Sequence, residues 1–208
     1  MNIGIIGSGM IGGTTARLFA RDGHSVVISN RRGPASIAVL VAEIGSNACA
    51  ASVEDAAKSA EVVLIAIPFG EYRDVPAKPL AGKIVVDAMN YYQQRDGRID
   101  FGGLSSTELV ARRLVDARLV KAFNTMYFQT LASEGRTDKP IEERLALFIA
   151  GDNEEAKAVI ARLIEEIGFA PIDTGGLHDG GLLQQPGSRI YNGPMTAPEA
   201  RTALASTR

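Results

Sequence analysis

The first residues with a chemically informative spacing form a glycine-rich segment near the N-terminus. Residues 7–12 read Gly-Ser-Gly-Met-Ile-Gly, a G-x-G-x-x-G pattern that follows an apolar run and precedes a helical pattern. In this context the first glycine permits a tight turn, the second lets a pyrophosphate approach the backbone, and the third lets helix and strand pack closely. The helix N-terminus then offers free N–H groups to the phosphates. The predicted phosphate-binding residues are Gly7, Ser8, Gly9, Met10, Ile11 and Gly12.

A polar segment after the second apolar run indicates which dinucleotide binds. The run 26–29 leads into Asn30, Arg31 and Arg32, and no acidic residue stands there. Sites for NAD place Asp or Glu at this point, to accept a hydrogen bond from the ribose 2′-OH. Two guanidinium groups and an amide suit a 2′-phosphate instead. We therefore expect the cofactor to be NADP (NADPH), although two solvated surface arginines remain an alternative.

Residues that follow the fourth, fifth and sixth apolar runs are further candidates. Ligands of doubly wound sheets lie beyond the carboxyl ends of the strands. We expect the cofactor to be walled by Ile67, Pro68 and Ala88. We expect the second reactant to contact Phe69, Asn90, Asn124 and Thr125. Plain core packing of Phe69 and a loop-capping role for Asn124 stay open as alternatives.

The same strand ends lack a convincing pair of groups for acid–base catalysis. His24 precedes the second run and His178 lies in the C-terminal tail. Lys121 ends the sixth run, and we interpret it as a lysine that reaches from a strand end toward solvent. Hydride transfer between NADPH and a conjugated ring needs little from the protein except positioning. The sequence therefore assigns no catalytic residue, and it favours a planar, cofactor-like acceptor over an alcohol.

The elements that position these residues alternate short apolar runs with helical patterns, as in parallel α/β proteins. Several runs are continuous Val/Ile/Leu segments, which is typical of strands buried on both faces. The expected strands are 2–6, 25–29, 48–50, 62–67, 83–87, 118–122, 145–150 and 169–173. The expected helices are 10–21, 36–44, 52–59, 105–114, 154–167 and 198–205.

This order of elements predicts a Rossmann NAD(P)-binding fold, a doubly wound parallel sheet of order 3-2-1-4-5-6 with two additional strands. The 208 residues fit one domain followed by a tail. We place the NADP-binding domain at residues 1–174. A Gly/Pro-rich tail with one short helix would then occupy residues 175–208.

Composition and charge exclude several functional classes. With 22 basic and 24 acidic residues the net charge is -2, which argues against nucleic-acid binding. One cysteine and two histidines argue against a metal site. The longest apolar run, 62–69, is far shorter than a bilayer span, and strand-like sequence from Asn2 argues against a cleavable signal peptide. We therefore expect a cytoplasmic protein that does not enter membranes.

The ordered set of segments resembles the NADP-dependent oxidoreductases of the coenzyme F-420 reductase (F-420-dependent NADP oxidoreductase) family. The N-terminal domain of the transmembrane ferric reductases is a more distant relative. The resemblance extends over about residues 1–180 and is carried by the segments 7–12, 23–31, 67–69, 120–125 and 151–152.

This resemblance implies a phosphate loop at residues 8–11 and a 2′-phosphate clamp at Asn30 and Arg31. A further basic residue that some members place after the clamp is missing here, and we expect Arg32 to compensate. Members that reduce a deazaflavin can place a histidine where this chain has Asn124. The acceptor therefore stays open.

Motifs and resemblance together predict an NADPH-dependent oxidoreductase that transfers hydride between NADP(H) and a flavin-like or deazaflavin (F-420-type) acceptor. One alternative is a dehydrogenase or reductase of a small hydroxy acid or imine, although the short tail does not supply the further helical domain such enzymes usually need. The other alternative is a non-catalytic NADP-binding module.

The tail also indicates an assembly. Its Gly/Pro-rich backbone is not expected to bury its own large apolar side chains, and exposed apolar groups on a tail often mark a partner surface. We therefore expect a homodimer in which each tail lies near its own or its partner's crevice. The apolar residues in question are Leu182, Leu183, Ile190, Tyr191 and Met195.

Overall fold

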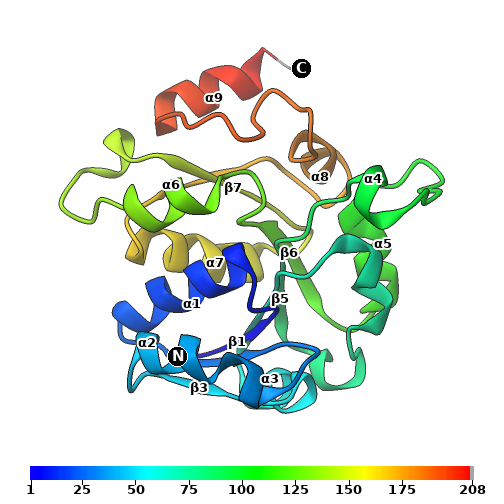
Figure 1. The fold of residues 1–208 in the computed structure, drawn as a ribbon. Helices are drawn as coiled ribbons and strands as arrows, with labels where there is room; N and C mark the ends of the chain where they lie inside the picture. The colour runs from blue at the N-terminus through cyan, green and yellow to red at the C-terminus, as the bar shows by residue number, and fades with distance from the viewer. Residues whose placement is uncertain (207–208) are drawn as a thin grey trace.

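The computed structural model describes residues 1–206, and within them one sheet of order β3-β2-β1-β4-β5-β6-β7-β8 forms the centre of the molecule (Figure 1). The strands are β1 (Asn2–Ile6), β2 (Ser25–Ser29), β3 (Ala48–Ala50), β4 (Val62–Ile65), β5 (Ile84–Asp87), β6 (Arg118–Ala122), β7 (Ala146–Ala150) and β8 (Ala170–Asp173). The expected α/β class and the order 3-2-1-4-5-6 with two further strands are confirmed.

One strand differs from the parallel arrangement that the sequence predicts. β7 is antiparallel to β6, with Lys121 opposite Ala150 and Ala122 opposite Ile149. β8 is again parallel to β7. The reason lies in the connection after β6. It holds the helix α6 (Phe128–Ser133) and a 3-10 turn, Ile141–Glu143, and it starts β7 beyond the carboxyl end of β6.

Helices cover both faces of the sheet, as a doubly wound fold requires. One face packs against α1 (Met10–Arg21), α2 (Ala38–Ile44), α6 and α7 (Glu154–Glu166). The other face packs against α3 (Val53–Ser59) and α5 (Ser106–Arg113) over β1 and β4 to β6, and against α9 (Ala197–Ala205) over β7 and β8. Two short helices, α4 (Gln93–Asp96) and α8 (Asp179–Leu183), lie in loops.

Short-range signals account for several helix ends. Ser105 and Glu108 form a reciprocal capping box at the start of α5. The Asn153 side chain accepts a hydrogen bond from the Ala156 N–H at the start of α7. Within residues 1–206, no helix combines the length and the apolar character needed to cross a bilayer.

The tail packs on its own domain, so the expectation that it cannot bury its apolar side chains is wrong. Ile190 is buried together with the alanines of α9 against β7 and β8. Leu145 forms an isolated bridge with Thr196. Of the five large apolar tail residues, Leu182 alone is exposed. The homodimer therefore stays a prediction, with less exposed apolar surface to support it.

A buried ion pair joins the carboxyl ends of β5 and β6. The side chain of Asp87 is 0% exposed and that of Lys121 is 1% exposed, and Lys121 Nζ lies 3.1 Å from Asp87 Oδ2. The Thr107 hydroxyl donates to the same oxygen at 2.8 Å, while Asp87 Oδ1 accepts from the Met89 N–H. Lys121 Nζ also donates to the Met89 carbonyl. The interpretation of Lys121 as a solvent-reaching lysine is wrong, because Asp87 draws it into the protein.

Removing the lysine should destabilise the fold strongly. We expect Lys121→Met to lower the free energy of unfolding by about 3–5 kcal/mol, because the Asp87 carboxylate would stay buried without its counter-ion. The double variant Asp87→Asn, Lys121→Met should recover part of this loss, since no unpaired charge remains. Urea unfolding followed by circular dichroism measures both values. A loss below about 1 kcal/mol in the single variant would contradict the importance given to the pair.

Candidate functional site

The glycine-rich turn between β1 and α1 has the geometry that its pattern predicts. Gly7 has φ +113°, and a Cβ there would lie 2.2 Å from the Ala66 carbonyl oxygen. A Cβ on Gly12 would lie 1.8 Å from the Gly7 carbonyl oxygen. A Cβ on Gly9 would meet no atom within 4 Å, so it would project into open space. The first and third glycines permit close packing, and the second leaves room for a ligand.

The N-terminus of α1 is suited to bind an anion. No side chain caps it, and its first turn holds no acidic residue. Its first N–H groups thus keep their hydrogen-bonding capacity, and the helix dipole adds positive potential. The space at Gly9 and these N–H groups fit the pyrophosphate of a dinucleotide. NADP therefore fits the turn, with Ser8, Gly9 and Met10 nearest to its phosphates.

The side chain of Asn30 joins the glycine-rich turn to the loop that follows β2. Its amide nitrogen donates to the Ser8 hydroxyl at 3.0 Å. Its amide oxygen accepts from the Arg32 N–H at 2.9 Å and from the Ser36 hydroxyl at 3.0 Å. Asn30 thereby fixes the two loops relative to each other. The sequence indicated a direct ligand contact for Asn30 and did not indicate this positioning role.

A first cleft, of about 470 Å³, lies between the carboxyl ends of β1, β2 and β4. Its lining includes Gly7, Ser8, Gly9, Asn30, Arg31 and Arg32. Arg31 is 80% exposed and forms an ion pair with Glu71 of the 3-10 helix Phe69–Asp74, with Nη1 2.8 Å from Oε1. Since Glu71 also lines the cleft, an acidic group holds the cation that we expect to bind a 2′-phosphate.

A second cleft, of about 380 Å³, continues from the first across the end of β4. Ile67 and Pro68 line both clefts. The expected cofactor residues Met10, Ile11 and Ala88 line the second cleft, whereas Gly12 is buried beneath the turn. The two clefts share lining residues and lie along the carboxyl edge of the sheet, which is where a dinucleotide binds in this fold.

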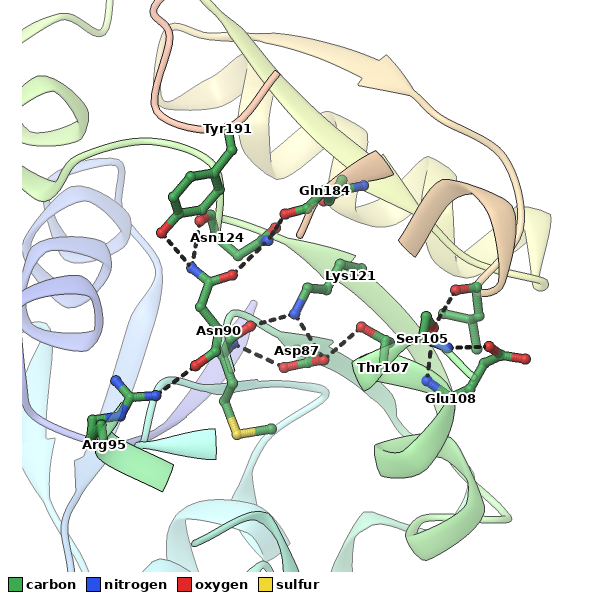
Figure 2. Close-up of polar contacts among 12 residues, drawn as sticks. Asp87, Asn90, Arg95, Ser105, Thr107, Glu108, Lys121, Asn124, Gln184 and Tyr191 are labelled. Carbon is green, nitrogen blue, oxygen red and sulfur yellow. Dashed lines mark hydrogen bonds and ion pairs between the residues drawn. The ribbon is translucent and has the colours of Figure 1, made fainter. Parts of the chain in front are cut away.

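Two asparagines from neighbouring strand ends line the second cleft and bind each other. Asn90 Nδ2 donates to the Asn124 carbonyl at 2.7 Å, and Asn124 Nδ2 donates to Asn90 Oδ1 at 3.1 Å (Figure 2). Asn124 also donates to the Gln184 carbonyl at 2.8 Å. Asn124 is 3% exposed, and its Oδ1 atom has no partner within the described chain. The sequence placed these two residues correctly at the cleft.

Tyr191 brings the tail to the same cleft. Its hydroxyl accepts from Asn90 Nδ2 at 3.2 Å (Figure 2). The same hydroxyl contacts the hydroxyl of Tyr92. Burial raises the pKa of Tyr191, and the hydrogen bond with Tyr92 adds to the rise. The phenol therefore stays neutral near pH 7 and serves as a hydrogen-bonding group. The tail thus lies at the second cleft of its own chain, which is one of the two positions expected for it.

Two expected acceptor contacts are not at the cleft surface. Phe69 is fully buried, with ring centroids 5.1 Å from Tyr72 and 5.9 Å from both Tyr91 and Phe101. This aromatic cluster holds the segment after β4 on the sheet, so the core alternative for Phe69 is the correct one. Thr125 is 4% exposed, and its carbonyl accepts from the Asn192 N–H. Neither side chain lines the second cleft.

Several cleft residues escaped the sequence analysis. They are Arg95, Met126, Tyr127, Phe128, Tyr191 and Asn192. Arg95 stands five residues after Asn90 in the loop that follows β5, so its place after a strand end was the signal available for it. Tyr191 was noted only as an apolar tail residue. Tyr127 and its neighbours follow β6 directly, and their position after a strand end was the signal available.

Comparison with known proteins supports the cofactor half of this site. Residues 2–91 match the family model described as "NADP oxidoreductase coenzyme F420-dependent". The matched segment contains the glycine-rich turn, the loop after β2 and the residues that join the two clefts. The chain is also 30% identical over 177 residues to "Metalloreductase STEAP3" of Rattus norvegicus, covering 84% of this chain and 34% of that protein. The chain thus spans about a third of the length of the curated relatives it matches.

Two solved structures share the fold over most of their length. A hypothetical protein from Sinorhizobium meliloti is 35% identical with a TM-score of 0.82, covering 94% of this chain and 95% of that one. A protein from Arthrobacter sp. FB24, provisionally described as an F420-dependent NADP reductase, is 28% identical with a TM-score of 0.72. That match covers 85% of this chain and 86% of the other.

Reversing the charge at Arg31 should change the choice of dinucleotide. One charge-assisted hydrogen bond contributes about 1.5–3 kcal/mol, or roughly 10- to 150-fold in affinity. We expect Arg31→Asp to weaken NADPH binding at least about tenfold and to affect NADH much less. Calorimetry with both nucleotides measures this. Equal affinities of the parent protein for NADPH and NADH would contradict a 2′-phosphate site.

Neutralising Glu71 should strengthen the same binding. The exposed Arg31–Glu71 pair is worth about 0.2–1 kcal/mol and must loosen when Arg31 turns to a phosphate. We expect Glu71→Gln to lower the Kd for NADPH by roughly 1.5- to 5-fold and to leave NADH unchanged. Glu142→Gln, which removes the exposed pair with Arg201, is the matched control. Weaker NADPH binding in Glu71→Gln would instead show that Glu71 orients Arg31 for its ligand.

Proposed function

Because residues 2–91 match the family model of coenzyme F420-dependent NADP oxidoreductases, we propose that this chain transfers hydride between NADP(H) and a flavin-like or deazaflavin acceptor. The observation that carries this proposal is that two neighbouring clefts at the carboxyl edge of the sheet share Ile67 and Pro68 in their linings. A dinucleotide with its pyrophosphate at the glycine-rich turn would extend its adenosine toward Arg31. Its nicotinamide would then enter the second cleft, beside Asn90 and Asn124.

The residues of the second cleft are suited to hold a planar partner. Tyr92, Tyr127 and Tyr191 supply aromatic faces, and the asparagine pair supplies amide groups fixed by their mutual hydrogen bonds. Aromatic faces and a few placed polar groups are what a flat heterocycle needs for orientation. Bound NADPH would supply the hydride, and the acceptor would take up its additional proton from water. The protein's part is alignment of the two rings and partial exclusion of solvent.

Among the described residues, the second cleft is lined by no carboxylate, histidine or lysine, the groups that most often transfer protons near neutral pH. Its ionisable side chains are Arg95 and the phenols of Tyr92, Tyr127 and Tyr191. Arg95 keeps its proton, and burial raises the pKa of Tyr191, so that hydroxyl stays neutral. Lys121 lies beneath the cleft, paired with Asp87. Oxidation of an alcohol or reduction of an imine requires a proton transfer at the oxygen or nitrogen bonded to the reacting carbon. A flavin-like ring can take its proton from water, so it does not need an acidic group of the protein. This favours a flavin-like acceptor over the small hydroxy acid or imine.

The curated relatives named metalloreductases raise the question of a metal ion as the final acceptor. Within residues 1–206, the group of side chains that could hold a metal ion is Asp22, His24 and Glu166. His24 precedes β2 and so lies at the amino edge of the sheet, opposite the clefts. Direct hydride transfer to a metal ion is not feasible, because a hydride carries two electrons and a ferric ion takes one. A flavin-like carrier would have to stand between them.

A matched pair of variants tests the proposed function. Gly9 has φ -74° and open space at its Cβ, so Asp and Asn both fit there as helix caps. We expect the parent to oxidise NADPH with FMN or a deazaflavin under anaerobic conditions, and Gly9→Asn to bind NADPH more weakly, because its side chain enters the space left for the pyrophosphate. Gly9→Asp should retain its melting temperature and lose NADPH binding by more than about tenfold, because its carboxylate faces the pyrophosphate.

NADPH deuterated at the transferred position should slow a single turnover of the parent, as hydride transfer requires. A parent protein that binds NADPH tightly but oxidises it with no acceptor would support the non-catalytic module instead.

A further inference from the structure

The second cleft contains one charged side chain within the described chain, Arg95 of α4. Every other residue that lines this cleft is apolar, aromatic or an amide. Arg95 is 45% exposed, so it faces both protein and solvent. A lone cation at the mouth of an otherwise uncharged cleft gives that cleft a preference for anionic ligands.

Arg95 is held in one orientation by its neighbours. Its Nε atom lies 2.8 Å from Asp96 Oδ1, and its Nη2 atom lies 2.8 Å from Asp96 Oδ2. Nη2 also donates to the Asn90 carbonyl at 2.5 Å (Figure 2). The guanidinium carbon lies 5.1 Å from the centre of the Tyr92 ring. These contacts tie the cation to the two loop residues that line the same cleft.

Asp96 does not compete with a ligand for this position. Its side chain is 1% exposed, and it does not line the cleft. Its Oδ2 atom accepts the Tyr92 N–H at 2.9 Å, so the carboxylate is fixed from a second side. Burial alone would raise the pKa of Asp96, but hydrogen bonds from Arg95 and from the backbone outweigh it and lower the pKa. The ionised carboxylate therefore orients the guanidinium from the protein side.

One edge of the guanidinium remains available. Among residues 1–206, no group accepts a hydrogen bond from Arg95 Nη1, since the hydrogen bonds of this guanidinium use Nε and Nη2. A guanidinium whose remaining N–H groups face a cleft matches the oxygens of a phosphate. The aromatic faces of Tyr92 and Tyr191 lie beside it, joined through their hydroxyl groups.

We propose that Arg95 binds the phosphate-bearing side chain of a planar acceptor, so that the second cleft selects phosphorylated flavin-like compounds over their uncharged counterparts. This inference rests on the proposed function, because it assigns the second cleft to the acceptor. It adds a specificity residue that lies outside the matched segment 2–91. In this arrangement Arg95 contributes to the affinity for the acceptor and takes no part in hydride transfer. The acceptor ring would lie against the tyrosines that line the second cleft.

The pair FMN and riboflavin tests this directly, because the two differ by one phosphate. Titrations followed by flavin fluorescence, with NADP⁺ at saturation so that no turnover occurs, give a Kd for each. We expect the parent to bind FMN roughly 10- to 100-fold more tightly than riboflavin, the range of one charge-assisted contact. Arg95→Gln should remove most of this difference and leave the Kd of riboflavin unchanged, and Arg95→Lys should keep part of it. Arg98→Gln, an exposed arginine of the same loop that does not line the cleft, is the matched control.

Each other result overturns the proposal in a recognisable way. Equal affinity of the parent for FMN and riboflavin would show that the cleft does not read the phosphate. Equal weakening of both flavins in Arg95→Gln would show that Arg95 only supports the loop. A raised KM for NADPH with unchanged flavin binding would assign Arg95 to the cofactor. Turnover separates this inference from the proposed function: NADPH oxidation with equal KM for both flavins refutes the inference alone, and absence of oxidation with every acceptor refutes the function.

Discussion

The buried pair of Lys121 and Asp87 fixes the turn on which the second cleft depends. Asp87 accepts a hydrogen bond from the Met89 N–H, and Lys121 donates one to the Met89 carbonyl. Both backbone polar groups of Met89 are therefore bound by charged side chains. These bonds fix the backbone conformation of the turn after β5, and in this conformation Asn90 contacts Asn124. Burying two charges is costly, and a hydrophobic pair could join the strands more cheaply. What the ions add is directional control of a backbone that lines the second cleft.

The neighbouring strand end shows a second local constraint. Phe123 has φ +62°, in the left-handed region that an aromatic residue rarely occupies and that costs on the order of 1–3 kcal/mol. Its ring is buried and packs edge-on against Phe19, at 5.9 Å between centroids. Packing of the ring offsets the backbone cost. The consequence is a sharp turn immediately before Asn124, which places this side chain against Asn90 and Gln184.

The sequence predicts those parts of the molecule that short-range patterns determine. The alternation of strands and helices and the packing roles of Gly7 and Gly12 depend on residues near one another in the chain, and the structure confirms them. Phe69 and Lys121 were misread because their partners, Tyr91 with Phe101 and Asp87, lie far along the chain. A phenylalanine after a strand reads equally as a ligand contact or as core. Only the position of those distant partners decides between the two.

The acceptor half of the site is built differently from the cofactor half. The matched family segment ends at residue 91, just before Tyr92 and Arg95, and it excludes Asn124 and Tyr191. The first cleft thus belongs to the segment that the family model describes, while much of the second comes from three separate later segments. Relatives described as a metalloreductase and as an F420-dependent NADP reductase both match this chain over most of its length. A shared turn with a variable second cleft is how one fold can pass hydride from the same cofactor to different acceptors. For this chain, we therefore expect the choice of acceptor to depend on the segments after residue 91. Among their described residues in the second cleft, Arg95 carries the one charge that can select an anionic acceptor.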